Sequence, residues 1–323
     1  MHQIKTTTTK AYLIGILCFL SIGLQDTFAQ PTNFNTSRNW ALNKKEFYFG
    51  LGPTQFLGDL GGQNRIGKDY SLRDIDFPST SFGGQIGFRY RFHRFWATTT
   101  NLNIGNFKGS DVLTSEPARH NRNLTFKSLI VELSQRIDFI IYSNEQVGRR
   151  YSVPGLRGFH NHNEQVYIFG GVGVFYYNPK GLYNGGWVPL RPLGTEGQGF
   201  ADGAKKYSPI SLSIPVGIGF KIGISRTWRI GMEVSYHKTF TDYIDDVSGS
   251  YYSAGKIGAK NGPVAAYMSN PSPTSNYPAG SQRGDKTDKD AFFFVNVNFT
   301  KSLSYGNSVG KKSTHWGSVK AKF

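Results

Sequence analysis

The most constraining feature of the sequence is a long, unbroken alternation of apolar residues with small or polar ones. Residues 210–224, ISLSIPVGIGFKIGI, place an apolar side chain at every even position and Ser, Pro, Gly or Lys at every odd one. Successive side chains of a β-strand point to opposite faces, so this segment predicts a strand with one apolar face. The run is about twice as long as a typical strand of a soluble protein.

The same pattern recurs along the chain. It is clear in residues 82–92, 127–141 and 228–240, and weaker in 46–52, 95–107, 165–177 and 290–303. Both faces of 165–177 are apolar or glycine, so the direction of its side chains cannot be read from the sequence. Together these segments predict about eight strands. A composition of 15% aromatic and only 18% charged residues favours an all-β fold.

A soluble β-sandwich also has alternating strands, but its water-facing positions are free to be Lys and Glu. Strands that cross a membrane need about 9–11 residues, with apolar side chains outward and polar ones inward. The small residues at odd positions of 210–224 suit a narrow interior. We therefore predict an eight-stranded antiparallel transmembrane β-barrel, monomeric, in the cell outer membrane.

The connections between the predicted strands support this topology. Those near 93–94 and 225–226 are very short, whereas those at 58–78, 108–123, 178–208 and 242–289 are long and predicted to be extracellular. One connection, 143–164, is long where a short periplasmic turn is expected. The expected organisation is a signal peptide at 1–29, a periplasmic segment at 30–45, the barrel at 46–303 and a basic periplasmic tail at 304–323.

Aromatic residues near the predicted strand ends suggest an interfacial girdle. They are Trp96, Tyr142, Tyr176, Tyr177, Trp228, Phe240 and Tyr243.

Charged residues on the polar strand faces are predicted to line the lumen. They are Arg89, Arg91, Glu132, Arg136, Asp138, Lys221, Arg229 and Glu233, with Gln85 on the same face. Eight strands enclose a space that side chains fill, and buried charges need partners, so a plug of arginine–carboxylate pairs is expected. The candidate mates of Arg89, Arg136 and Arg229 are Glu132, Asp138 and Glu233. A conducting pore would need more strands.

The sequence offers little for catalysis. Ser235 and His237 share a strand face with Glu233, and these residue types can supply a nucleophile, a base and an orienting acid. No oxyanion donors are identifiable, so no enzyme activity is expected. The only cysteine, Cys18, lies in the signal peptide.

No metal and no cofactor are expected either. Asp242, Asp245 and Asp246 could bind a divalent ion, but a turn rich in Asp is the commoner meaning of such a pattern. His160 and His162 are a weak metal signal because no further ligand lies nearby.

A formal net charge of +16 suggests nucleic acid at first, but the predicted topology places the basic residues on the periplasmic side. Nucleic acid is therefore not an expected partner. Some of these residues form either a docking surface for an acidic periplasmic partner or a solvated surface without a partner. They are Arg149, Arg150, Arg157, Lys311, Lys312, Lys320 and Lys322.

Three segments resemble the small outer-membrane barrels of Bacteroidota related to PorG, a component of the type IX secretion system. They are GDLGG (58–62), FGGVGVFYYNPKG (169–181) and RIGMEVSYHKTFTDYIDDVSGSYY (229–252). The last contains the family motif at an extracellular strand end, formed by Thr241, Asp242, Tyr243, Asp245 and Asp246. This chain adds a basic turn at 143–164 and a distinctive tail.

The resemblance implies an eight-stranded barrel without known catalysis that contacts the periplasmic ring of that secretion machine. The expected partners are therefore outer-membrane lipids and periplasmic ring or scaffold proteins. A paralogue with another partner, a lipid-modifying enzyme using Ser235 and His237, and a small transport pore are the alternatives.

Overall fold

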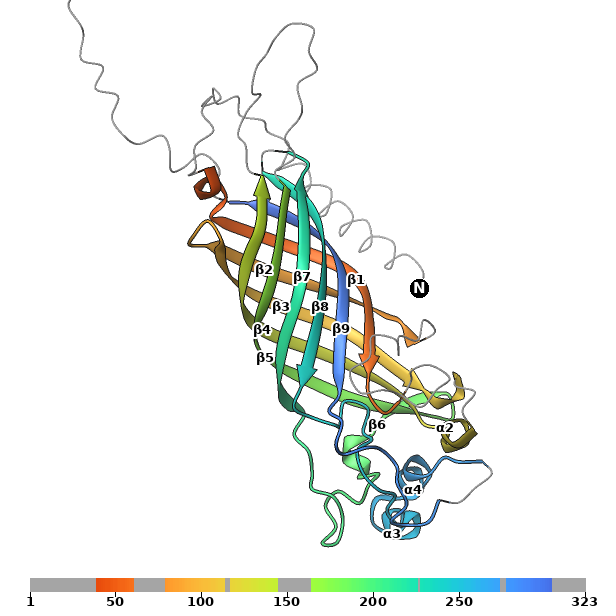
Figure 1. The fold of residues 1–323 in the computed structure, drawn as a ribbon. Helices are drawn as coiled ribbons and strands as arrows, with labels where there is room; N and C mark the ends of the chain where they lie inside the picture. Colours follow the sequence, from red (N-terminus) through yellow and green to blue (C-terminus); the bar gives the residue numbers. More distant parts are fainter. Residues whose placement is uncertain are drawn as a thin grey trace, which may run out of the picture. The chain divides into compact units, whose positions relative to one another are not determined.

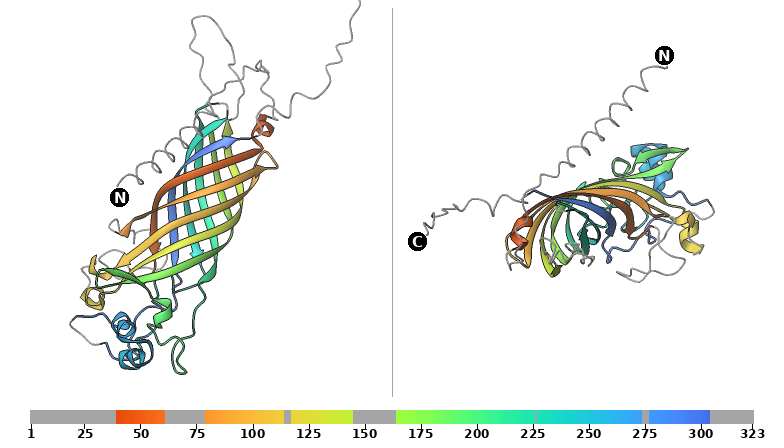
Figure 2. Two further views of the ribbon diagram at one scale, coloured as in Figure 1. Left: turned by 180° about the vertical axis from the view of Figure 1, so that it is seen from behind. Right: turned by 90° about the horizontal axis from the view of Figure 1, so that it is seen from above.

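The computed structural model describes residues 39–60, 79–113, 117–144, 164–225, 227–273 and 277–303. Its sheet has the strand order β4-β3-β2-β1-β9-β8-β7-β5-β6, and β4 also pairs with β5, so eight antiparallel strands close into a barrel (Figures 1 and 2). The eight are β1 (Lys45–Leu57), β2 (Ser81–Arg91), β3 (Trp96–Ser110), β4 (Thr125–Asn144), β5 (Glu164–Tyr183), β7 (Ile210–Gly223), β8 (Trp228–Thr239) and β9 (Ala291–Ser302). The predicted eight-stranded barrel is confirmed.

The strand β6 (Gly186–Pro189) is a short addition to the end of β5. Asn184 and Gly185 join the two strands, and both have positive φ, 46° and 77°. Asn-Gly at two consecutive positive φ values is the preferred two-residue hairpin turn. β5 therefore extends to 20 residues, well beyond the predicted end at 177.

The helices among the described residues are short. One, η1 (Asn39–Asn43), precedes β1, and the others lie in connections between strands: η4 (Asp111–Leu113), α2 (Pro117–Arg122), η5 (Arg191–Leu193), α3 (Ala254–Asn261) and α4 (Pro263–Ser269). Within the described ranges, no helix has both the length and the apolar character needed to cross a membrane.

The two ends of the barrel differ. Glu46 at the start of β1 pairs with Ser302 at the end of β9, so both chain ends leave the barrel on the same side. The short β2–β3 and β7–β8 connections lie on that side too. The opposite end carries α2, α3 and α4 (Figure 1). In outer-membrane barrels, termini and short turns face the periplasm, so the helical end is extracellular.

The outer wall is apolar. In β4, Leu129, Leu133 and Ile137 are exposed whereas Glu132 and Arg136 are buried in the lumen. The exposed apolar side chains of the other strands include Phe47, Phe49, Leu51, Phe82, Ile86, Phe88, Ile104, Ile168, Val172, Val174, Ile210, Leu212, Val216, Ile218, Phe220, Met232, Val234, Val297 and Phe299. Such a surface is far more apolar than a soluble monomer exposes, and lipid chains match it.

The small residues of 210–224 make room for aromatic rings from a neighbouring strand. Tyr167 of β5 lies directly opposite Gly219 of β7, and a Cβ added to Gly219 would stand 2.2 Å from the tyrosine ring. Tyr48 of β1 covers Gly87 of β2 in the same way, at 2.3 Å. The alternation along β7 thus fits both environments at once, with apolar side chains against lipid and glycine beneath lumen rings.

Aromatic side chains fill the extracellular half of the interior. This core consists of Phe56, Leu60, Phe107, Leu124, Phe126, Ile130, Phe175, Tyr177, Ile244, Val247, Phe292 and Phe294. The prediction that Tyr177 belongs to an interfacial girdle is wrong, because it faces inward and is buried. Tyr243 also lies inside, stacked on Tyr207 with ring centroids 4.5 Å apart. The parity of 165–177 could not be read from the sequence, and this explains the error at Tyr177.

Candidate functional site: the lumen and the extracellular cap

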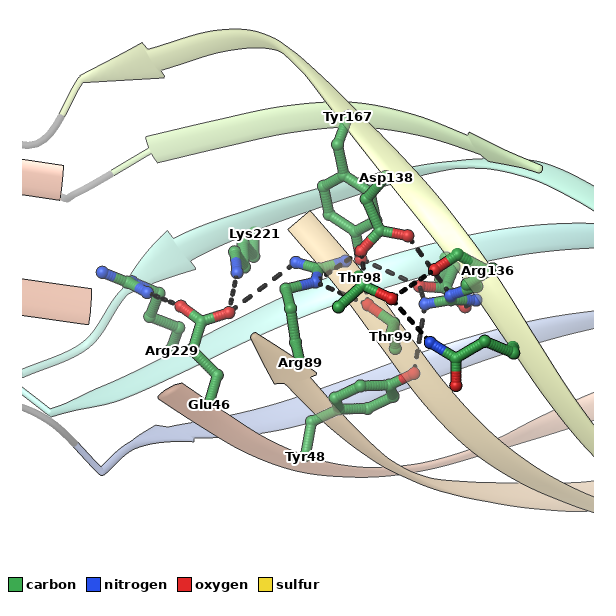
Figure 3. Close-up of polar contacts among 12 residues, drawn as sticks. Glu46, Tyr48, Arg89, Thr98, Thr99, Arg136, Asp138, Tyr167, Lys221 and Arg229 are labelled. Atoms are coloured by element: carbon green, nitrogen blue, oxygen red, sulfur yellow. Dashed lines mark hydrogen bonds and ion pairs between the residues drawn. The ribbon is translucent and has the colours of Figure 1, made fainter. Parts of the chain in front are cut away.

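The periplasmic half of the lumen is organised around Glu46, a residue that the sequence analysis did not select. Its carboxylate forms ion pairs with Lys221 of β7 and Arg229 of β8, and lies 3.7 Å from Arg89 of β2 (Figure 3). All four side chains are buried. The alternation in 46–52 could have identified it, since Glu46 shares the parity of inward-facing Tyr48.

A second group of charges lies next to it along the barrel. The Arg89 Nε is 2.6 Å from the Asp138 carboxylate, which also accepts a 2.6 Å hydrogen bond from the Thr99 hydroxyl. The Arg89 guanidinium lies over the Tyr167 ring at 4.0 Å, a cation–π contact. Arg89 therefore links β1 and β4 by ion pairs and β5 by the cation–π contact.

Arg136 and Glu233 form the strongest pair by geometry. Both terminal nitrogens of Arg136 contact the Glu233 carboxylate at 2.7 Å, a two-point contact that spans the lumen from β4 to β8. The Tyr167 hydroxyl donates to the same carboxylate at 2.9 Å, and Arg136 donates to the Tyr48 hydroxyl at 3.1 Å (Figure 3). The two tyrosines that cover glycines thus also satisfy this pair.

Two residues assigned to the lumen lie at its margins or in an uncharged layer. Arg91 donates to the Arg94 carbonyl at 2.5 Å beside the short β2–β3 turn, and its guanidinium lies 5.7 Å from the Trp40 ring. Gln85 donates to the Asn298 side chain at 2.7 Å.

Glu132 has a different partner from the one expected. None of the described arginines contacts it; instead the Nδ1 of His237 lies 2.9 Å from its carboxylate, and Ser213 and Asn103 donate to it. The other nitrogen of His237, Nε2, lies 3.0 Å from the Ser235 hydroxyl. The sequence pointed to Glu233 as the third member of this group, but Glu233 pairs with Arg136.

The order Ser235–His237–Glu132 is that of a nucleophile, a base and an orienting acid. This group is closed off from solvent. The three side chains are 3%, 1% and 0% exposed, and the His237 ring stacks on Phe292 at 4.8 Å. A cavity of about 170 Å³ lies away from these residues, between α4 and the rim of the barrel. Its lining includes Leu124, Leu182, Leu190, Met268 and Arg283.

The motif residues Thr241 to Asp246 follow β8 and hold the extracellular loops together. Asp245 accepts hydrogen bonds from the backbone of Leu60 at 3.1 Å and Val247 at 3.0 Å. Asp246 accepts from the hydroxyls of Thr195 and Tyr207, both at 2.5 Å. We call the extracellular loops joined in this way the cap: residues 58–60, 111–113, 117–124, 190–209, 240–273 and 277–290.

Two arginines complete the cap, Arg283, which is buried, and Arg122, which is half-buried. Arg283 contacts Glu196 at 3.1 Å and donates to the Asp246 carbonyl at 2.6 Å. Arg122 pairs with Asp111 at 2.7 Å and donates to the Asp59 carbonyl at 2.8 Å. Loops distant in sequence are thereby fixed to one another above the aromatic core.

The carboxyl groups of the cap are strongly influenced by burial. Loss of hydration raises the pKa of Asp242 to about 7, and the nearby Asp59 carboxylate acts in the same direction. Burial also raises the pKa of Asp246 to about 6, although the Arg283 charge opposes it. The pKa of Asp245 and that of Asp290 are likewise raised by burial and by neighbouring carboxylates. Among the described residues, no three His, Cys, Asp or Glu side chains are arranged to hold a metal ion.

The basic residues considered as a partner surface lie outside the described residues. They are Arg149, Arg150, Arg157, Lys311, Lys312, Lys320 and Lys322. His160 and His162 lie outside them as well.

The fold, the apolar wall and the filled lumen define an outer-membrane β-barrel protein. Among solved structures, the Neisserial surface protein A is similar, with 8% identity over 80% of this chain and 97% of that one and a TM-score of 0.34. The attachment invasion locus protein Ail of Yersinia pestis, in complex with the heparin analogue sucrose octasulfate, has 10% identity over 80% and 98%, with a TM-score of 0.33. OprG from Pseudomonas aeruginosa has 9% identity over 80% and 96%, with a TM-score of 0.32. No family model matches the chain, and no curated protein matches its sequence.

Proposed function

We propose that this protein is a non-enzymatic anchor that holds a periplasmic protein complex at the outer membrane. The observation that carries the proposal is the filled lumen, in which Glu46, Asp138 and Glu233 are paired with arginine or lysine and an aromatic core fills the extracellular half. A barrel filled in this way is suited to holding position in the membrane rather than to passing a solute.

The complex that we propose is the type IX secretion machinery, with the chain acting as a PorG-like component. Support for this comes from the resemblance of residues 229–252 to that family and from the excess of basic residues at 149–157 and 311–322. Basic segments on the periplasmic side favour an acidic protein surface as the partner. The barrel itself is proposed to be monomeric, with no nucleic acid partner and no cofactor.

Charge reversal tests the partner. Changing Arg149, Arg150 and Arg157 to Glu should release the barrel from its periplasmic partners during copurification and impair secretion. Association should also be sensitive to salt, because exposed charges are screened over about 8 Å at physiological ionic strength. Deleting 305–323 should act in the same direction.

The matched control reverses three exposed lysines of the cap, Lys205, Lys206 and Lys286. The same change of charge on the extracellular side should leave copurification and secretion intact. If the arginine variant and the deletion both retain the same partners and secrete normally, the anchoring proposal is wrong.

One observation favours a second candidate, a lipid-modifying enzyme: the hydrogen-bonded order Ser235–His237–Glu132. We expect Ser235→Ala and His237→Ala to leave the mass spectrum of lipid A unchanged, because burial denies these residues a substrate. Loss of an acyl-chain modification in Ser235→Ala, with the barrel still folded, would favour the enzyme over the anchor.

A further inference from the structure

Three lysines stand side by side on the outer wall of the barrel near its extracellular rim. Lys108 of β3 lies directly opposite Lys127 of β4, which in turn lies directly opposite Lys180 of β5. Directly opposed residues on antiparallel strands are about 5 Å apart, so the three Cα atoms span about 10 Å. Lys108 and Lys127 are exposed and Lys180 is half-buried, whereas their neighbours Phe107 and Phe126 face the lumen. We call these three residues the lysine row.

The register shows where the lysine row stands relative to the apolar wall. Two residues toward the periplasm, the same strands present Asn106, Leu129 and Asn178. Two residues further, they present Ile104, Val131 and Tyr176, all on the lipid-facing side. The wall therefore changes from apolar side chains, through a level of two amides and Leu129, to ammonium groups within about 13 Å of strand. This order matches the passage from acyl chains to headgroups.

A tryptophan beside the lysine row supports its placement at the level of the lipid headgroups. Trp187 of β6 is exposed, and the Lys127 ammonium lies 6.0 Å from its ring. Exposed tryptophan is typical of the membrane interface, where the ring is partly in contact with hydrocarbon and partly with water. Lysine side chains at such a level extend their ammonium groups toward the headgroups.

The row lacks a counter-charge within the described part of the chain. Three cap cations have carboxylate partners there, in the pairs Arg122–Asp111, Arg283–Glu196 and Lys256–Asp202. No such ion pair includes Lys108, Lys127 or Lys180. Like charges directly opposite each other on a sheet destabilise it. An anion supplied from outside the described chain would convert this repulsion into binding.

We propose that the lysine row binds the phosphate groups of an anionic lipid in the outer leaflet. Phosphate is the anion that lysine ammonium groups commonly bind as point charges. A lipid whose acyl chains cover Ile104, Val131 and Tyr176 would bring its headgroup to the level of the row. Free phosphate has the same charged group but lacks those chains, so the lipid is favoured. The proposal does not depend on the anchoring function.

The test compares lipid A carrying both phosphates with the same lipid A after removal of both. Native mass spectrometry of the full-length protein in detergent should show bound phosphorylated lipid and little of the dephosphorylated form. Replacing Lys108, Lys127 and Lys180 by Gln should weaken binding of the phosphorylated lipid by on the order of a hundredfold. The matched control replaces Lys205, Lys206 and Lys286 of the cap by Gln and should bind as the wild type does.

Two further variants keep the result clear if the triple Gln variant does not fold. Replacing all three lysines by Arg should retain binding, and Lys127→Gln alone should weaken it. Equal binding of both lipid A forms would overturn the proposal, as would unchanged binding in the folded Gln variants. If inorganic phosphate alone protected the wild-type barrel from thermal unfolding as well as phosphorylated lipid A does, the lipid would be the wrong source.

Discussion

At the scale of single residues, one buried carboxylate faces three buried cations near the periplasmic mouth. Glu46 contacts both Lys221 and Arg229 and lies near Arg89, and all of these side chains are shielded from water. Removing one member of a buried ionic group leaves uncompensated charge, which costs more than an exposed ion pair contributes.

We therefore expect Glu46→Gln to lower the free energy of unfolding by about 3–5 kcal/mol. The measurement is urea-induced unfolding in lipid vesicles, followed by tryptophan fluorescence and heat-dependent migration. Glu164→Gln at the start of β5 is the control and should unfold close to wild type, because Glu164 is only half-buried. Adding Arg229→Met to Glu46→Gln should recover part of the loss. Equal stability of Glu46→Gln and wild type would contradict this account.

The buried carboxyl groups of the cap should make its stability depend on pH. The pKa of Asp242 is raised from 3.8 to about 7, so the folded cap favours the protonated carboxyl. Its stabilising contribution is complete below the unfolded pKa and is lost as the pH rises through the folded one. The raised pKa values of Asp245 and Asp290 act in the same direction. The cap should therefore be more stable at pH 5 than at pH 8.

Amide hydrogen exchange over residues 240–252, corrected for its intrinsic pH dependence, measures this directly. Protection should fall between pH 5 and pH 8, and Asp242→Asn should reduce that fall because the amide cannot ionise. Asp202→Asn, at an exposed position of the cap, should leave the fall unchanged. A cap that became more protected from exchange as the pH rose would show that the predicted direction of the pH dependence is wrong.

At the scale of elements, adjacent strands pack together where an aromatic ring on one strand lies over a glycine on its neighbour inside the lumen. Tyr167 opposite Gly219 and Tyr48 opposite Gly87 each fill space that a Cβ would occupy. The same tyrosines bond to Glu233 and Arg136, so the strand pairing and the charge network depend on the same rings.

Gly219→Val should therefore destabilise the barrel by about 1–3 kcal/mol, since the added atoms overlap the Tyr167 ring and displace its hydroxyl from Glu233. Gly170→Ala is the control. A Cβ at Gly170 would meet a single neighbouring atom, of Val216 at 3.9 Å, so this variant should be close to neutral. Urea unfolding of both variants in vesicles measures the difference, and equal midpoints would contradict the ring-over-glycine packing.

At the scale of the whole barrel, the lumen is filled in two different ways along the barrel axis. Paired charges around Glu46, Arg89 and Arg136 fill the periplasmic half, and the aromatic core that includes Phe107 and Phe292 fills the extracellular half. The cap lies over the second filling and is fixed by Arg122 and Arg283.

Planar-bilayer recordings of the purified protein should consequently show no stable conductance. A solute would have to displace both the paired charges and the aromatic core, and neither filling gives way without leaving unpaired charge or empty space. Glu46→Gln with Arg136→Ala removes part of the charged filling and should still not conduct, because the aromatic core remains. A steady current through the wild-type protein would revive the transport pore.

The strands and the faces of their side chains were determined by sequence alone wherever one face is polar. A period of two assigns every side chain of 82–92, 127–141 and 228–240 to lipid or lumen, since a shift by one residue would bury the charges in lipid. The order of long and short connections then sets the topology. In 165–177 both faces are apolar, and only pairing with β4 and β7 decided that Tyr177 faces inward.

Which charges meet was decided only by tertiary structure. The alternation brought Arg136, Glu233 and Glu132 into the lumen but could not select the Arg136–Glu233 pair or the histidine partner of Glu132. Glu132 and Glu233 have the same chemistry and the same facing. What distinguishes them is their height along the barrel, and strand register and tilt set that height only when all eight strands close.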